Sequence, residues 1–256
     1  MSNPVTVLID GAVAVVTVTN PPVNAIDDAV LEGLGAAAEQ LAGDGTVRAV
    51  VLTGAGDKAF MAGADLNAFK QMLEGHSSIE DHTELTRRVF GAWESLPQPT
   101  VAAIQASAVG GGLEAALVCD LLVADERARF GFPEVRLGLI PGAGGTQRLL
   151  RRAGVGAAKD LLFLGTTVGA AEAKQLGIVN IVADEGAALE RAVALAERLA
   201  ALPALAVQAA KRAVASSIDA GLDREHDLFV TLFNSADVRE GVDAFLAKRD
   251  PNWSHA

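Results

Sequence analysis

Two glutamates are the side chains in this sequence whose types and surroundings favour chemistry. Glu114 follows Val109-Gly110-Gly111-Gly112-Leu113, and Glu134 lies twenty residues on (134 − 114 = 20), after Phe130-Gly131-Phe132-Pro133. Both have apolar neighbours, and burial among apolar groups raises the pKa of a carboxyl group toward the range useful for proton transfer. If the fold brings the two together, they could hold and deprotonate one water molecule.

The glycines before Glu114 have a counterpart earlier in the chain, Lys58-Ala59-Phe60-Met61-Ala62-Gly63-Ala64-Asp65-Leu66. Small residues after a strand let the backbone approach a ligand closely and leave N–H groups unpaired. Two such loops on neighbouring strands could direct two N–H groups at one oxygen and stabilise an oxyanion. Taken alone, either stretch is better explained by tight packing of a helix against a strand.

Other kinds of site have no motif here. The sequence contains no dinucleotide-binding or phosphate-loop glycine pattern and no serine nucleophile elbow. The four histidines are scattered, each is expected on the surface, and no His or Cys pair has metal-ligand spacing, so no metal site is predicted. Cys119 lies in an apolar run and is expected to be a buried thiol.

Composition narrows the class of protein. The chain has 256 residues, is 50% hydrophobic and carries a net charge of −11, which argues against disorder and against nucleic acid as a partner. Arg148, Arg151 and Arg152 are expected on a solvated helix face. The N-terminus lacks the pattern of a signal peptide, and no apolar run has the length of a membrane span. We therefore expect a soluble, cytoplasmic protein with no membrane partner.

Apolar periodicity predicts the elements that must position the glutamates. Strands at 5–9 and 12–19 form a hairpin around Asp10-Gly11, and further strands are expected at 49–53, 100–104, 121–124 and 178–182. Helices are expected at 27–41 with Asp27 as N-cap, near 77–95, after the three glycines, and from 185 to 248 with breaks near Pro203 and Gly221. Strands and helices alternate, so we predict an α/β core over 1–200 and a C-terminal helical module over 201–256.

The motifs together resemble those of the crotonase (enoyl-CoA hydratase/isomerase) superfamily. The resemblance rests on Ala62-Gly63-Ala64-Asp65-Leu66, Gly110-Gly111-Gly112-Leu113-Glu114, Pro133-Glu134, and the run from Leu139 to Arg148. It covers almost the whole chain, and the segment from Pro141 to Arg148 is its most specific part. By this resemblance the fold is a crotonase-like ββα spiral core, and the C-terminal helices assemble a homotrimer or a hexamer built as a dimer of trimers.

The resemblance also implies a reaction and its residues. It is closest to the two-glutamate enoyl-CoA hydratases, in which water adds to C3 of a trans-2-enoyl-CoA thioester, as in fatty acid β-oxidation. Glu114 and Glu134 match the catalytic pair, and the amides of Ala64 and Gly111 match the oxyanion hole. Contacts with the acyl-CoA thioester are implied for five positions: Ala62, Asp65, Leu66, Asn67 and Lys248. No metal or redox cofactor is implied, because coenzyme A belongs to the substrate.

Two rival functions share this fold. The first is another crotonase-type reaction, chiefly isomerisation of a 3-enoyl-CoA or dehydration of an unusual hydroxyacyl-CoA. Isomerisation needs only one proton-moving base, which would leave Glu114 largely dispensable. A non-catalytic or RNA-binding relative is disfavoured by the intact glutamates, the glycine loops and the acidic charge. One departure from the family pattern is Gln105-Ala106-Ser107, where many relatives have Asn-Gly; it could tighten the approach to the pocket. Phe69, Met72 and Leu73 could line an acyl pocket.

Overall fold

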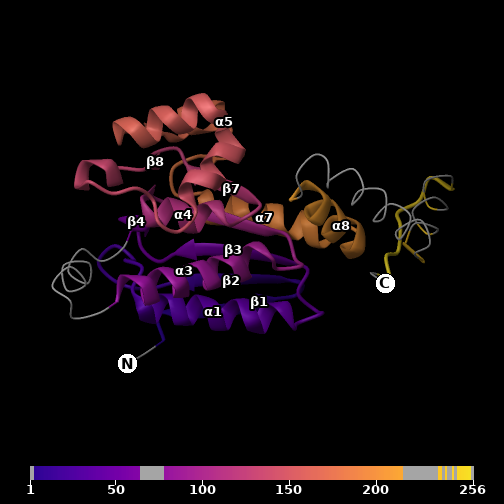
Figure 1. The fold of residues 1–256 in the computed structure, drawn as a ribbon. Helices are drawn as coiled ribbons and strands as arrows, with labels where there is room; N and C mark the ends of the chain where they lie inside the picture. Colours follow the sequence, from indigo (N-terminus) through magenta and orange to yellow (C-terminus); the bar gives the residue numbers. More distant parts are fainter. Residues whose placement is uncertain are drawn as a thin grey trace.

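A computed structural model describes residues 3–63 and 78–215, then 236, 237, 240, 244 and 247–254. Its centre is a six-stranded sheet with helices on both faces, so the predicted α/β class is confirmed (Figure 1). The strand order is β1-β2-β3-β5-β7-β10. The strands are β1 Val5–Asp10, β2 Val13–Val18, β3 Ala49–Gly54, β5 Thr100–Ile104, β7 Leu121–Asp125 and β10 Ile181–Ala183.

The hairpin predicted around Asp10-Gly11 is present, with β1 antiparallel to β2 and Gly11 at φ 56°. From β2 onward all neighbours in this sheet pair in parallel. The parallel strands β3 and β5 are buried at every residue. A parallel sheet covered on both faces explains why the sequence shows these strands as continuous apolar runs.

Side chains that alternate along β3 enter two separate cores. Val50 and Leu52 face the cluster that contains α1 (Asp28–Ala42) and α3 (Ile79–Glu94). Ala49 and Val51 face α7 (Ala188–Ala200), which buries an alanine at every fourth position toward the sheet. The period of two in the strand therefore divides the helices between its faces. Asp27 caps α1 as predicted, its carboxylate accepting from the Val30 amide at 2.8 Å.

A second, four-stranded sheet lies beside the first, and sequence reasoning missed it. Its order is β4-β6-β8-β9, and its strands have three residues each: Ala59–Met61, Ser107–Val109, Arg129–Gly131 and Thr167–Gly169. The prediction that only one strand follows Gly142 is therefore wrong, because β9 lies there as well. Three residues are too few to show a period of two.

This second sheet gives the fold its repeating ββα path. The chain leaves β3 for β4, β5 for β6 and β7 for β8, and a helix follows the second and third of these pairs. Those helices are α4, Gly111–Leu117, and, after the 3₁₀ helix η1 at Glu134–Leu137, α5, Gly145–Leu164. The ββα spiral predicted from the resemblance is thus the observed fold, and both glutamates lie just after a strand of the second sheet.

The last elements continue toward the C-terminus. α6 spans Ala170–Gln175, and α8, Ala204–Val214, begins directly after Pro203, where a break was predicted. The break predicted near Gly221 lies outside the described residues. No single helix in the described part is long and apolar enough to cross a membrane; α7 and α8 meet that criterion only as a pair bent by 109°.

Candidate active site

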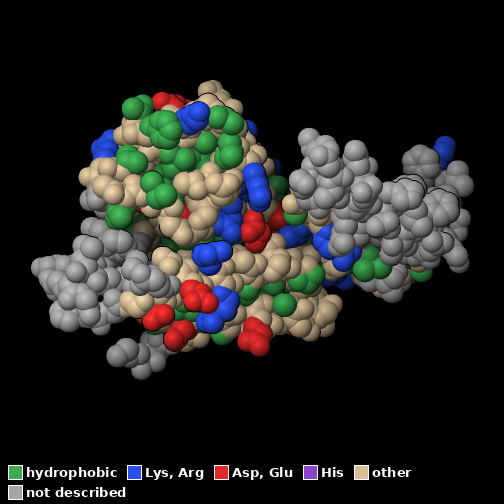
Figure 2. All heavy atoms as spheres, viewed as in Figure 1, with side chains coloured by type: hydrophobic (Ala, Val, Ile, Leu, Met, Phe, Trp, Pro, Cys, Tyr) green, Lys and Arg blue, Asp and Glu red, His purple; other side chains and the backbone are tan. Residues whose placement is uncertain are grey.

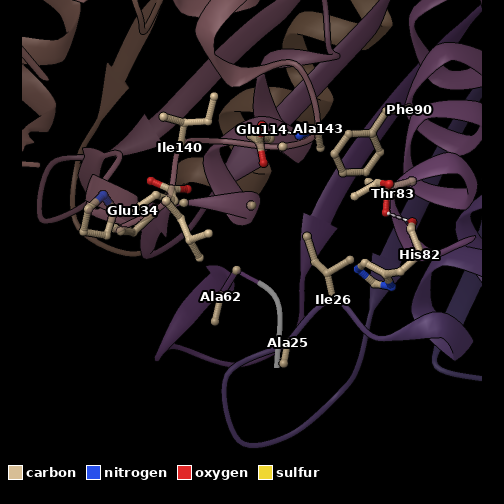
Figure 3. Close-up of a pocket in the computed structure, with 18 of the residues that line it drawn as sticks. Ala25, Ile26, Ala62, His82, Thr83, Phe90, Glu114, Glu134, Ile140 and Ala143 are labelled. Carbon is tan, nitrogen blue, oxygen red and sulfur yellow. Dashed lines mark hydrogen bonds between the residues drawn. The ribbon is translucent and has the colours of Figure 1, made fainter. Parts of the chain in front are cut away.

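A cavity of about 750 Å³ opens between the second sheet and α3, and its lining is mostly apolar (Figure 3). The loop after β2 supplies one wall, and the end of β4 with the start of α4 supplies another. The side chains of Glu114 and Glu134 both point into this space from different elements (Figure 3). The structure therefore brings together the two carboxylates that the sequence placed twenty residues apart.

Glu114 lies in α4, a short helix that begins directly after Gly110. Gly110 has a φ of 58°, and Glu114 is 4% exposed. Its Oε1 accepts hydrogen bonds from the amides of Ala143 and Gly145, both at 2.8 Å. Burial raises the pKa of Glu114 above its ordinary value, and the two amide bonds and the charge of Arg148 oppose that rise. Two donors on one oxygen favour the carboxylate form and leave Oε2 to face the cavity.

Glu134 has contrasting surroundings. It begins η1 directly after Pro133, and its Oε2 is buried without a hydrogen-bond partner. Burial, with a contribution from the negative charge of Glu114, raises the pKa of Glu134 to about 7. Near neutral pH this group can therefore either donate or accept a proton, which is the property that general acid–base catalysis requires.

Glycine residues lie next to Glu134 and at the position predicted for the substrate thioester. A Cβ on Gly110 would lie 3.1 Å from Oε1 of Glu134, and a Cβ on Gly63 would lie 3.1 Å from the Gly111 nitrogen. Gly111, as the first residue of α4, presents an amide with no partner inside the helix, and it lines the cavity together with Ala62. Both glycine stretches therefore converge at one place.

Several predicted residues lie outside the described part of the chain. These are the second oxyanion donor, three proposed coenzyme A contacts and three proposed acyl-pocket residues: Ala64, Asp65, Leu66, Asn67, Phe69, Met72 and Leu73. Their roles stay predictions. Lys248 is described, but segment 247–254 lies at the far end of the molecule from the cavity (Figure 1). A contact between Lys248 and the substrate would therefore require a neighbouring subunit.

One wall of the cavity was not foreseen. His82, Thr86 and Phe90, on successive turns of α3, line it, and Figure 3 shows His82 and Phe90 beside the cavity. The Nδ1 atom of His82 lies 2.9 Å from Oδ1 of Asp28, and the Thr86 hydroxyl donates to the backbone carbonyl of His82. The expectation that every histidine is a plain surface residue is wrong for His82, because α3 packs against α1 and turns this face inward. The helical spacing of these residues was the available signal.

Two further expectations need correction. Arg151 is exposed as predicted, but Arg148 and Arg152 are largely buried and donate to backbone carbonyls, because the face of α5 that carries them packs on α4. The Gln105 side chain donates to the carbonyls of Gly54 and Ala59 at 2.7 and 3.1 Å and does not line the cavity. The Gln105 side chain therefore braces the link between β3 and β4.

Comparison with known proteins identifies relatives over nearly the whole chain. The family model for enoyl-CoA hydratase/isomerase matches residues 9–256. A short-chain-enoyl-CoA hydratase of Clostridium acetobutylicum is 38% identical over 94% of this chain and 93% of its own length. A probable enoyl-CoA hydratase of Bacillus subtilis is 38% identical over 98% of both chains.

Comparison with solved structures identifies relatives of the same kind. The crystal structure of an enoyl-CoA hydratase from Bacillus anthracis superposes with a TM-score of 0.93 at 36% identity, covering 99% of this chain and 100% of that one. Pseudomonas aeruginosa DspI gives a TM-score of 0.91 at 37% identity, covering 98% of this chain and 97% of that one. A family model matching almost every residue, and relatives matching at full length, mean that this chain belongs to the enoyl-CoA hydratase/isomerase (crotonase) family.

Proposed function

We propose that this protein is an enoyl-CoA hydratase, a hydro-lyase that reversibly adds water to trans-2-enoyl-CoA and forms 3-hydroxyacyl-CoA. The observation that carries the proposal is the pair Glu114 and Glu134, which face one apolar cavity: two backbone amides bind the carboxylate of Glu114, and burial raises the pKa of Glu134 to about 7. Relatives named as enoyl-CoA hydratases at 38% identity support it.

The two environments suggest how the reaction runs. Glu114, whose carboxylate form is favoured by two amides, accepts a proton from the water that attacks C3. Glu134, whose pKa of about 7 leaves it protonated in a large share of molecules, gives its proton to C2. Each addition consumes one water and transfers one proton to Glu114 and one from Glu134. Return of a proton from Glu114 to Glu134 then resets the site.

Charge that develops on the thioester oxygen needs donors. We assign that role to the amide of Gly111, which lines the cavity, and to the amide of Ala64, the residue after Gly63 in the sequence. Removing one such donor typically costs about a hundredfold to a thousandfold in rate. The proposed chemistry uses no metal or redox cofactor, and within the described residues no three His, Cys, Asp or Glu side chains form a metal site.

The proposal extends to assembly, substrate contacts and location. Segment 201–256 is proposed to join three chains, or two sets of three, and to bring Lys248 to a neighbour's coenzyme A. The backbone and side chains from Ala62 through Asn67 are proposed to contact the same moiety. A cytoplasmic location is part of the proposal, and the acidic charge of −11 disfavours a nucleic-acid partner.

The test follows loss of the conjugated enoyl-thioester absorbance with crotonyl-CoA and with a longer trans-2-enoyl-CoA. Wild type is expected to hydrate both substrates, and Glu114→Gln and Glu134→Gln are each expected to lose about 10²–10⁴-fold in kcat because a proton-transfer group is gone. Glu172→Gln, an exposed glutamate on α6, is the matched control and should retain wild-type activity.

A trans-3-enoyl-CoA serves as the discriminating substrate. If wild type converts only this compound, or if Glu114→Gln stays near wild type, hydration is the wrong assignment. Glu134 would then be the single base of an isomerase.

A further inference from the structure

The orientation of Glu114 depends on one short loop. Both amides that bind its Oε1 belong to Ala143 and Gly145, two residues apart. Gly144 lies between them in the left-handed region at φ 96°, and Gly142 precedes them. Because glycine has wide backbone freedom, the sequence of this loop does not by itself fix its backbone conformation. A contact from outside the loop must fix the two amides.

Arg148 supplies that contact from the first turn of α5. Its Nη1 donates to the carbonyl of Ala143 at 2.7 Å, and its backbone amide donates to the carbonyl of Gly144 at 3.0 Å. The guanidinium lies so close beneath the loop that a Cβ on Gly144 would fall 2.3 Å from Nη1. Ala143 thus donates through its N–H to Glu114 and accepts through its C=O from Arg148.

Glu94, the last residue of α3, holds the guanidinium in turn. Its Oε2 lies 2.8 Å from Nη2 of Arg148 and its Oε1 lies 3.3 Å from Nε. Such a two-point contact fixes the plane of the guanidinium, which a single ion pair does not. The Arg148 side chain is only 14% exposed, so water competes little at its end of the pair, whereas that of Glu94 is 46% exposed.

We propose that Arg148, clamped by Glu94, is a positioning residue that fixes the Ala143–Gly145 loop and thereby holds Glu114 ready to accept a proton from water. This inference rests on the proposed function for its role in catalysis, while the contacts themselves do not depend on it. It links α3, which forms the cavity wall, to the carboxylate at the cavity centre. Neither Arg148 nor Glu94 lines the cavity, so both act through the loop.

Charge adds a second effect in the same direction. The positive charge of Arg148 opposes the rise in the pKa of Glu114 that burial causes. Among the described residues, the other titratable groups that line the cavity are Glu134, from η1, and His82, from α3. Loss of Arg148 leaves both of these in place and should move the pKa of Glu114 further upward. The acid limb of the rate profile should then shift to higher pH, because Glu114 acts as a carboxylate.

The experiment compares Arg148→Gln, Arg148→Lys and Glu94→Gln in the hydration assay across pH. Arg148→Gln is expected to lower kcat about 10- to 100-fold with KM near wild type, since a misplaced catalytic group costs rate while the substrate contacts remain. Arg148→Lys should restore the position of the acid limb but only part of kcat, because an ammonium lacks the two-point fork. The double variant of Arg148→Gln with Glu94→Gln should be no slower than Arg148→Gln, as expected for residues acting on one path.

Arg152→Gln is the matched control. Arg152 lies one turn further along α5 and donates to the carbonyls of Cys119 and Asp120, just beyond the C-terminal end of α4, and not to the loop that binds Glu114. Its loss should lower thermal stability without moving the acid limb. If Arg148→Gln behaves like Arg152→Gln, with reduced stability but an unmoved profile and unchanged kcat, Arg148 is a structural residue and the proposal is overturned.

A readout that needs no turnover separates this proposal from the proposed function. With ¹³C-labelled glutamate, the Glu114 carboxyl signal, assigned by its absence in Glu114→Gln, should titrate at higher pH in Arg148→Gln than in wild type. If wild type fails to hydrate any enoyl-CoA, the proposed function is lost while this titration still decides the positioning role. An unchanged titration in Arg148→Gln would then overturn it.

Discussion

Glu114 and Glu134 are chemically identical side chains in one cavity, and their neighbours make them unlike. Glu114 gives one oxygen to two amides, whereas Oε2 of Glu134 is buried with no partner. Burial disfavours the charged form of Glu134 and raises its pKa to about 7, so this group can carry a proton near neutral pH. This division assigns acceptor and donor roles in a reaction that must move a proton at each end of a double bond.

The raised pKa of Glu134 makes a prediction about stability. The unfolded chain titrates this group near 4.5 and the folded chain near 7, so the folded state binds more protons between these values. Its contribution to the free energy of unfolding is therefore full below about pH 4.5 and is lost as pH rises through about 7. Glu134→Gln, which cannot ionise, should match wild type in Tm near pH 5 and exceed it near pH 8.5. Calorimetry at the two pH values measures the difference, and an equal difference at both would contradict the assignment.

At the scale of elements, the site depends on β4 lying directly against the start of α4. Gly112 allows this approach, because a Cβ there would fall 1.7 Å from the carbonyl oxygen of Met61. The contact sets the distance between the end of β4 and the Gly111 amide, which lies close to Gly63. Gly112 thus serves helix–strand packing, as one of the two explanations from sequence requires, and the oxyanion role of Gly111 stays a prediction.

Gly112→Ala is expected to lower the free energy of unfolding by about 2–4 kcal/mol, since backbone has to move to admit the methyl group. It should also reduce kcat, because β4 and α4 separate at the proposed oxyanion site. Denaturant unfolding and the hydration assay measure the two effects. Gly91→Ala on α3 is the control: a Cβ there meets nothing within 4 Å, so stability should hold or rise slightly. A Gly112→Ala protein as stable and active as wild type would refute the packing argument.

At the scale of the whole molecule, the described surface carries apolar side chains that one chain leaves uncovered. They gather over α5, the uppermost helix in Figure 1, where Figure 2 shows a green area. Its most exposed members are Val155 at 56%, Phe163 at 71% and Leu164 at 60%. Apolar side chains grouped in this way mark a surface for association, which fits the proposed trimer or hexamer.

Sedimentation of the whole protein is expected to give three or six times the 26.3 kDa mass of one chain. Phe163→Asp should weaken this assembly, because it places a charge in a surface that association would desolvate. Lys159→Ala, an exposed change on the same helix, should leave the assembly intact. A monomeric wild type would contradict the proposed assembly, and an intact assembly in Phe163→Asp would exclude this surface from it.

The sequence by itself determined what local patterns control. Asp27 as a helix cap, the hairpin at Asp10-Gly11, the buried parallel strands and the helix break at Pro203 each follow from a few neighbouring residues. The motifs also singled out Glu114 and Glu134, because acids among glycines and apolar residues have few structural uses.

Tertiary structure decided everything that depends on distant residues meeting. The three-residue strands of the second sheet exist only because each pairs with a neighbour remote in sequence, so they left no periodic signal. The inward face of α3 with His82 and the clamp of Arg148 by Glu94 arise in the same way. The different hydrogen bonding of the two glutamates is likewise set by which buried donors reach each carboxylate, and that is a property of packing rather than of sequence.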